Sequence, residues 1–309
     1  MNAWFPVSPC TPQACTGHHG AVRPVLPAVA RLVAGSLLAL GGAACTPVAA
    51  ALTQPVRDRL VRRWSRAVLR TFGVRTRITG SPDGGCGGGE PAVGRGGGEP
   101  GSGGEPAVAR TGGELVVANH ISWLDIPLVA AALPARMLGK SEIRRWPLLG
   151  TLAARGGTLF IDRESLRALP ASVGAVADAL RAGDRVVAFP EGSTRCGGGP
   201  PGAFRHAVFQ AALDAGATVR PARISYRVEP APAGAGCERL PARAVAFVGD
   251  DPLHASLWRV VRAAGVTAEV TLLPPLPTGG AGDRRTLARL AQTAVASDTA
   301  NLPAVSVHH

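Results

Sequence analysis

Short apolar runs alternate with longer amphipathic segments over most of the chain. The short runs are bounded by Gly, Pro and charged residues, and they predict β-strands over 74–78, 115–118, 137–138, 158–161, 186–189, 219–226, 244–248 and 268–273. The longer segments predict helices over 126–133, 141–154, 165–182, 204–215, 256–264 and 284–297. This order predicts an α/β fold with a central mixed sheet flanked by helices, in which reactive groups gather at the carboxyl ends of strands.

The same pattern divides the chain into four parts. Residues 1–23 show no period and predict a disordered leader, and residues 24–72 predict an N-terminal membrane-associated helical segment. Residues 73–277 form the α/β domain, which a repetitive Gly-rich stretch over 80–113 interrupts as a disordered insert. Residues 278–309 predict a C-terminal helix and tail.

The segment 32–56 contains no charged residue, and Arg31 and Arg57 bound it. Its length is sufficient to cross the hydrocarbon core of a bilayer, but glycines and prolines dilute it, and Pro47 should break or kink a helix. These features favour a membrane-inserted or re-entrant hairpin. A buried core helix is the simpler alternative, and a cleaved signal peptide is the least favoured.

The next segment, 57–72, predicts an amphipathic helix rich in arginine. A helical wheel places on one arc Leu60, Val61, Trp64, Ala67, Val68 and Phe72, with Leu69 as a misfit, and on the other side Arg59, Arg62, Arg63, Arg66 and Arg70. This arrangement favours a helix that lies in an anionic membrane surface. The alternative is a surface helix that packs its apolar arc on the core.

Overall composition indicates an anionic partner. The chain has 33 Lys and Arg against 21 Asp and Glu, for a net charge of +12. Aromatic residues make up only 4%, with a single tyrosine, which argues against nucleic acid as the partner. The six cysteines form no C-x-x-C pair, so we predict neither a zinc site nor a disulfide framework.

The first candidate for chemistry is the pair His120 and Asp125. The strand over 115–118 runs directly into His120, and Pro127 requires a helix to begin just before it. The imidazole therefore lies in the turn before the helix, where it can fold back onto the carboxylate. Such a contact fixes the histidine tautomer and leaves the other ring nitrogen as a base for an alcohol. A helix cap made by Ser122 and Asp125 is the alternative, and the two roles are compatible.

Three further strand ends carry polar groups. The strand containing Phe160 ends before Arg163, whose guanidinium is suited to a phosphate, or to a surface ion pair with its acidic neighbours. Another strand stops at a proline and delivers Glu191 and the turn Gly192-Ser193-Thr194, whose backbone N–H groups are suited to an anion. In the fourth, Pro221 predicts an edge strand or a bulge near the site.

In this order and spacing, the four blocks resemble those of the glycerolipid acyltransferases, and in particular the bacterial 1-acyl-glycerol-3-phosphate acyltransferases. The blocks read H-x-x-x-x-D, G-x-x-F-I-x-R, F-P-E-G and V-x-P, and the resemblance covers roughly residues 57–277. It implies that His120 is the general base and Asp125 its partner, and that the acceptor and its phosphate are held by Phe160, Arg163, Glu191, Gly192, Ser193 and Thr194. Pro221 then lies on the acyl-donor side or shapes the site.

The resemblance also implies an activity and a location. Enzymes of this family move an acyl group from acyl-CoA or acyl carrier protein to a lysophospholipid acceptor, without a metal or other cofactor. The implied acceptor is 1-acyl-sn-glycerol-3-phosphate, which gives phosphatidic acid. The implied partner is an anionic phospholipid membrane, at the cytoplasmic face of the bacterial inner membrane, with no nucleic acid.

One departure from the family pattern concerns the acceptor. The commoner third block is E-G-T-R, whereas here Thr194 takes the place of that arginine and Arg195 follows one residue later. A subgroup that includes enzymes acylating lyso-ornithine lipids has F-P-E-G followed by Ser-Thr or Thr-Thr, and its members also resemble this chain over 248–260. Lyso-ornithine lipid is therefore the alternative acceptor.

Two alternative functions, which are not acyl transfer, explain less of the sequence. A non-catalytic peripheral membrane-binding protein accounts for the basic helix but leaves the order of the four blocks to chance. A nucleic-acid-binding module accounts for the charge alone. A serine hydrolase is disfavoured because the chain has no G-x-S-x-G.

Overall fold

The computed structural model describes residues 10–80, 112–145, 149–162, 167–198, 202–229, 239–279 and 282–297 of the chain. Arg163 and nearly all of the Gly-rich stretch lie outside these residues.

The described residues form one eight-stranded mixed sheet, as the sequence predicted. Its strand order is β1-β8-β6-β2-β5-β3-β4, with β7 paired to β6. The strands are β1 (Arg75–Thr79), β2 (Glu114–Ala118), β3 (Arg136–Lys140), β4 (Leu159–Ile161), β5 (Arg185–Ala188), β6 (Thr218–Val228), β7 (Leu240–Pro241) and β8 (Thr267–Leu272). β2 runs parallel to both of its neighbours, β5 and β6, and β8 is antiparallel to β6. The carboxyl ends of β2 and β5 therefore meet at one edge.

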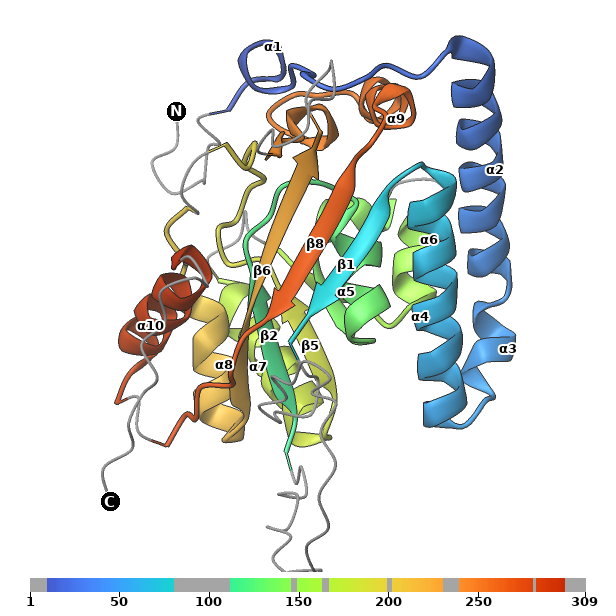
Figure 1. Cartoon of the computed structure of the whole chain (residues 1–309). Helices are drawn as coiled ribbons and strands as arrows, with labels where there is room; N and C mark the ends of the chain where they lie inside the picture. The colour runs from blue at the N-terminus through green and yellow to red at the C-terminus, as the bar shows by residue number, and fades with distance from the viewer. Residues whose placement is uncertain are drawn as a thin grey trace, which may run out of the picture.

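Helices cover both faces of the sheet (Figure 1). One face carries α2 (Val25–Ala44), α4 (Gln54–Thr71), α5 (Asp125–Ala132) and α9 (Leu253–Arg262), and the other carries α7 (Leu169–Arg181), α8 (Ala207–Ala215) and α10 (Arg284–Ala296). Short helices complete the chain: α1 (Pro12–Cys15), α3 (Thr46–Ala50), α6 (Leu149–Arg155), and 3₁₀ turns at Ser141–Arg145 and Arg243–Val245. In β2, Val116 and Ala118 pack on the first face while Leu115 and Val117 pack on the second, so this strand is buried on both sides.

Two predicted elements differ from the structure. The predicted strand over 244–248 is instead a 3₁₀ turn followed by irregular chain, because its backbone bonds to the loop after β2 and not to the sheet: Phe247 N donates to Ile121 O at 3.0 Å. The predicted helix over 141–154 is divided into the 3₁₀ turn and α6.

Pro221 lies in the interior of the sheet and not in an edge strand as predicted. Its carbonyl accepts from Leu273 N at 3.0 Å, on the side that faces β8. The N–H and C=O of one residue point to the same side of a strand, so the missing N–H also faces β8. In the register of β6 with β8, Pro221 lies opposite Leu273, so the proline removes one hydrogen bond of this pair, and Leu273 O instead accepts from Arg220 Nη1 at 3.4 Å.

The N-terminal segment forms a helical hairpin, with α2 beside α4 (Figure 1). α2 ends at Ala44, just before Pro47, as the proline predicted. Small residues at seven-residue spacing, Ala28, Gly35 and Gly42, lie on the inner side of α2. A Cβ on Gly35 would lie 2.8–3.0 Å from the ring of Phe72, and one on Gly42 would overlap the indole of Trp64. These glycines allow the aromatic rings to lie directly against the α2 backbone.

Two arginines attach α2 to the ends of other helices. The Arg31 guanidinium donates to the carbonyls of Arg70 and Thr71 at the end of α4, at 3.1 and 3.3 Å. Arg23 donates to the carbonyls of Val261 and Ala263 at the end of α9, at 2.6 and 2.9 Å. Both cations bind carbonyls at the carboxyl end of a helix, where the helix dipole favours positive charge.

The segment before α2 is also ordered from residue 10. The structure places α1 there and pairs Val22 with Ala263, so residues 10–23 differ from the predicted disordered leader. Its contacts are to distant parts of the chain, among them the end of α9 and the turn before that helix, which sequence spacing does not reveal.

The buried side of α4 differs from the predicted arc. Its buried residues are Ser65, Val68 and Leu69, and Leu69, the misfit on the wheel, has no exposed surface. The helix packs this side against α5 and the core, while Leu60 of the predicted arc is exposed. The core-packing alternative therefore describes this side of α4.

Adjacent glycines in α2 give a test of the close contact between α2 and α4. We expect Gly42→Ala to lower the stability of the fold by about 1–3 kcal/mol, because its new methyl group overlaps Trp64. Gly41→Ala is the matched control: a Cβ there meets nothing within 4 Å, and alanine favours a helix by about 0.5–1 kcal/mol over glycine. Thermal unfolding in one detergent measures both variants, and equal midpoints would contradict the packing described.

Candidate active site

The site lies where the chain leaves β2, beside the end of β5. Asn119 directly follows β2, and its side chain forms two hydrogen bonds with the backbone of Ile224 on β6: Nδ2 donates to the carbonyl at 2.9 Å, and Oδ1 accepts from the N–H at 2.8 Å. This pair of bonds fixes the backbone immediately before His120. The sequence argument missed Asn119, because its partner lies on a strand far along the chain.

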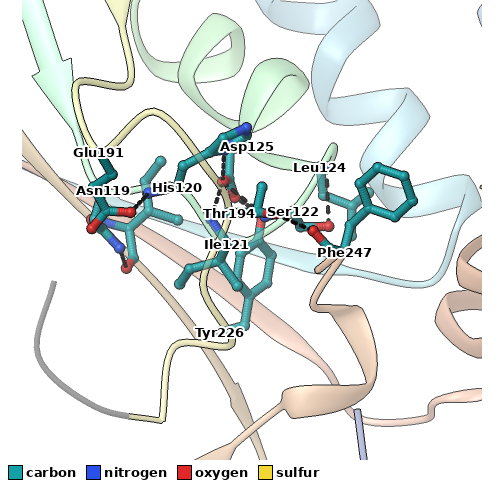
Figure 2. Close-up of polar contacts among 11 residues, drawn as sticks. Asn119, His120, Ile121, Ser122, Leu124, Asp125, Glu191, Thr194, Tyr226 and Phe247 are labelled. Carbon is teal, nitrogen blue, oxygen red and sulfur yellow. Dashed lines mark hydrogen bonds and ion pairs between the residues drawn. The ribbon is translucent and has the colours of Figure 1, made fainter. Parts of the chain in front are cut away.

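The predicted contact between His120 and Asp125 is confirmed. His120 Nδ1 lies 2.7 Å from Asp125 Oδ2, and Asp125 is the first residue of α5 (Figure 2). The Asp125 side chain is fully buried, whereas 22% of the His120 side chain is exposed. The carboxylate therefore lies inside the protein and the imidazole lies at its surface.

Asp125 accepts three further hydrogen bonds that replace its lost hydration. Oδ2 accepts from the N–H groups of Ile121 and Ser122 at 2.7 and 2.9 Å, and Oδ1 accepts from the Tyr226 hydroxyl at 2.6 Å. The Ser122 hydroxyl meanwhile accepts from Leu124 N at 3.3 Å. The N-cap of α5 is Leu124, without a side-chain cap, so the predicted cap by Ser122 is wrong. The buried carboxylate of Asp125 is stabilised by four donors.

Tyr226, the only tyrosine of the chain, is held as a donor. Burial first, and then the charge of Asp125, raise the pKa of Tyr226 well above its ordinary value. Its phenol therefore remains protonated and donates to Asp125 throughout the neutral range.

The other side of the His120 ring is supported by Phe189, which follows β5. The two rings are stacked, with centroids 4.1 Å apart and an interplanar angle of 13°. With Nδ1 directed at Asp125, Nε2 has no hydrogen-bond partner among the described residues. Tautomer and orientation are thus fixed, and Nε2 is available to accept a proton from a hydroxyl group.

Glu191 holds two loops together. Its Oε2 accepts from His120 N at 3.2 Å and its Oε1 accepts from Gly202 N at 2.7 Å, while the residue is only 5% exposed. Burial raises the pKa of Glu191, although the two backbone donors oppose that shift. Both oxygens of this predicted substrate ligand therefore already bind the backbone of the protein.

The rest of the F-P-E-G-S-T block and the arginine after it are held by hydrogen bonds within the block, to Phe247 and to the loop after β2. Gly192 has a φ of 80°, which favours glycine, and its N–H closes a turn onto Phe189 O at 3.2 Å. The Thr194 hydroxyl donates to Phe247 O, and Arg195 N donates to His120 O at 2.8 Å. The block thus positions the backbone on both sides of the imidazole.

Phe160 and Pro221, two further predicted site residues, are not part of the hydrogen-bonded group around His120 and Asp125. Phe160 is in β4 at the edge of the sheet, separated from β2 by β3 and β5, and its ring lies 5.7 Å from the guanidinium carbon of Arg144. Pro221 is buried in β6, and Arg163 lies outside the described residues. The structure therefore brings together His120, Asp125, Glu191, Gly192 and Thr194.

The chain is similar to known proteins over the part that carries this site. A family model described as Acyltransferase matches residues 103–225, a range that contains the His120–Asp125 pair and Glu191. A solved structure of a 1-acyl-sn-glycerophosphate acyltransferase from Thermotoga maritima has the same fold: the TM-score is 0.59 at 16% identity, over 88% of this chain and 92% of that one.

Curated relatives carry two different names. A lyso-ornithine lipid O-acyltransferase of Pseudomonas aeruginosa is 40% identical over 59% of this chain, and a 1-acyl-sn-glycerol-3-phosphate acyltransferase of Neisseria gonorrhoeae is 37% identical over 56%. The matched segments span 66% and 64% of those two proteins. A lyso-ornithine lipid O-acyltransferase of Brucella abortus is 30% identical over 77% of this chain and 81% of its own length.

The hydrogen bond between Tyr226 and Asp125 is testable by a double-mutant cycle. We expect Tyr226→Phe to lower the free energy of unfolding by about 1.5–3 kcal/mol, because it leaves Oδ1 of a buried carboxylate without its donor. In an Asp125→Asn background the same change should cost much less, since the charge is gone.

Ser256→Ala is the matched control for this cycle. It also removes a fully buried hydroxyl, but one that accepts from Trp123 Nε1 at 3.2 Å and does not touch Asp125. Its effect should be additive with Asp125→Asn to within about 0.5 kcal/mol. Additive effects for Tyr226→Phe as well would show that the phenol does not stabilise the carboxylate.

Proposed function

The chain belongs to the acyltransferase family, and from this premise we propose that it is an O-acyltransferase acting on a lysolipid. It moves a fatty acyl group from acyl-CoA or acyl carrier protein to the free hydroxyl of the acceptor. The observation that carries the proposal is the His120–Asp125 pair, with Nδ1 bound to a buried carboxylate and Nε2 open at a strand end.

The geometry supports a direct transfer between the two substrates. His120 Nε2 takes the proton of the acceptor hydroxyl as its oxygen attacks the thioester carbonyl carbon. Asp125 stabilises the imidazolium that forms and holds the ring in place. The tetrahedral intermediate then collapses, the C–S bond breaks, and the imidazolium returns its proton to the departing thiolate.

The developing oxyanion requires donors that are not already engaged. The N–H groups of Ile121 and Ser122 both donate to Asp125. These donors could lie near the start of α5 or in the turn after Glu191. Because the two N–H groups before α5 are engaged, we favour the turn. In that turn Gly192 N already donates to Phe189 O and Arg195 N to His120 O, so we assign the oxyanion to the N–H of Ser193.

The first candidate acceptor is 1-acyl-sn-glycerol-3-phosphate, with Arg163 as the phosphate ligand. A specific observation favours a second candidate, lyso-ornithine lipid. The hydroxyl of Thr194, which takes the place of the usual arginine, donates to Phe247 O and so connects two loops. Relatives named for that second acceptor are 40% and 30% identical to this chain.

We further propose that α2 holds the enzyme in a membrane. Val25–Gly42 is long and apolar enough to cross a bilayer, and only 11% of it is buried within the protein. Its exposed side is a continuous apolar stripe of Leu26, Val29, Val33, Leu37 and Leu40. Exposed arginines of α4, among them Arg59, Arg63 and Arg66, are suited to anionic headgroups. We place the enzyme at the cytoplasmic face of the inner membrane, where both acyl donors occur.

Replacing the base tests the proposed reaction. We expect His120→Ala to lower the rate of acyl transfer by about 10²–10⁴-fold because the proton acceptor is lost, and to keep the fold because Asp125 retains three of its four donors. His254→Ala is the matched control, since that histidine is exposed on α9, and it should keep full activity. The assay uses labelled acyl-CoA or acyl carrier protein with each acceptor in separate reactions.

The acceptor assay separates the two candidates. Product from 1-acyl-sn-glycerol-3-phosphate supports the first, and product from lyso-ornithine lipid alone overturns it in favour of the second. Wild-type activity in a folded His120→Ala protein would refute the assigned base.

The apolar stripe of α2 gives a second test. Leu26 and Leu37 are 82% and 64% exposed, and we expect the double variant Leu26→Asp, Leu37→Asp to bind lipid vesicles at least about 100-fold more weakly. Flotation with phosphatidylglycerol-containing vesicles measures this. Leu290→Asp, on α10 and 47% exposed, is the control and should float like the wild type. Unchanged binding of the double variant would exclude α2 as the anchor.

A further inference from the structure

Three cysteines meet at the carboxyl end of the sheet, apart from the His120–Asp125 pair. The Sγ atoms of Cys10, Cys15 and Cys196 all lie within 4.8 Å of one another. Cys10 is buried, and the other two are partly buried against the same core cluster. Two come from the segment around α1 and the third from the loop after β5, so the cluster joins distant parts of the chain.

Local structure brings the first two thiols together. α1 begins after Thr11, whose hydroxyl accepts from Ala14 N, and Cys15 N donates to Thr11 O at 3.0 Å. This single helical turn folds Cys15 back toward Cys10. The segment packs closely on the turn before α9, where a Cβ on Gly249 would lie 3.3 Å from Cys10 O. Figure 1 shows α1 above this end of the molecule, near α9.

The third thiol lies in the loop that positions the imidazole. Cys196 follows Arg195, whose N–H donates to His120 O, and Gly197 comes next with a φ of 70°. A Cβ on Gly197 would lie 2.9 Å from Ile121 Cδ1, so this loop is packed directly on the chain after β2. Cys196 therefore lies between the loop that holds His120 and the two cysteines of the segment around α1.

We propose that these three thiols form a binding site for a thiophilic divalent cation, Zn²⁺ being the natural candidate. Cys10 and Cys15 form a C-x₄-C pair, within the spacing that structural zinc sites use for ligands on one turn, and Cys196 is the distant third ligand. Tetrahedral Zn–S bonds of about 2.3 Å separate two sulfurs by about 3.8 Å, so small side-chain movements suffice. Each thiol that becomes a ligand releases its proton, and a water molecule or an external thiol takes the fourth position.

The geometry favours a cation over a disulfide. A disulfide joins only two sulfurs, at about 2.05 Å, and would leave the third thiol of this group out. A soft cation prefers thiolate ligands and can bind all three of these sulfurs at once. A bound cation would fasten the segment before α2 to the loop that carries Glu191 and Arg195.

Metal binding to the full-length protein in detergent tests the site directly. After chelation and dialysis under reductant, we expect the wild type to bind about one Zn²⁺ per chain, and Co²⁺ to give thiolate-to-metal charge-transfer absorption. Cys15→Ser and Cys196→Ser should each weaken binding by more than about 100-fold, because losing even a partner of a ligand costs 10–100-fold. Cys45→Ser, at an exposed cysteine outside the cluster, is the control and should bind like the wild type.

A second measurement needs no variant and so does not depend on how well one folds. Zn²⁺ should protect Cys10, Cys15 and Cys196 of the wild type from alkylation and leave Cys45 reactive, as peptide mass spectrometry resolves. Absence of stoichiometric binding, equal affinity in Cys15→Ser and Cys45→Ser, or a Cys15–Cys196 disulfide in protein isolated without air would each overturn the proposal. None of these outcomes depends on acyl transfer.

Discussion

The buried charge of Asp125 is the constraint that shapes the site. A carboxylate without exposed surface is stable only when hydrogen-bond donors replace its water, and here the donors come from the turn before α5 and from Tyr226 on β6. The turn must therefore direct two N–H groups inward, and this leaves the imidazole of His120 at the protein surface. The pairing of β2 with β6 fixes where Tyr226 reaches the carboxylate. The orientation of one ring thus depends on the order of the sheet.

Sequence reasoning found the parts of this site that are local. The strand before His120 and the spacing to Asp125 predict the contact because six consecutive residues contain both groups and the turn between them. Tyr226 and Asn119 escaped notice since their partners lie on different strands, and only the sheet brings them together. The apolar run over 244–248 was predicted as a strand for the same reason. Its composition is typical of a strand, but its backbone bonds to the loop after β2.

Helical periodicity had a different limit at the N-terminal hairpin. A helical wheel separates an apolar side from a charged side. It does not show whether the apolar side packs on a neighbouring helix or faces lipid. α4 turns Leu69 to the core although the wheel excluded it, because the aromatic rings of α4 pack on glycines of α2. The exposed apolar surface of the hairpin then falls to the outer side of α2, whose leucines and valines have no protein neighbour to cover them among the described residues. The helical character of this segment could be predicted, but not which of its helices packs on the core and which keeps an exposed apolar side.

The block after β5 shows that residues of a motif can lie beside a substrate site without binding the substrate. Glu191 and Thr194 both bond to backbone groups of the protein, and Arg195 contributes its N–H to His120 O. These contacts position the loop and leave few side chains to recognise an acceptor. Ser193 makes no side-chain hydrogen bond among the described residues, and Arg195 Nε is buried with no partner there. Gly202 is needed beside it, because a Cβ would overlap that guanidinium. The block after β5 therefore acts chiefly on the backbone around His120, through Glu191 on one side of that residue and Arg195 N on the other.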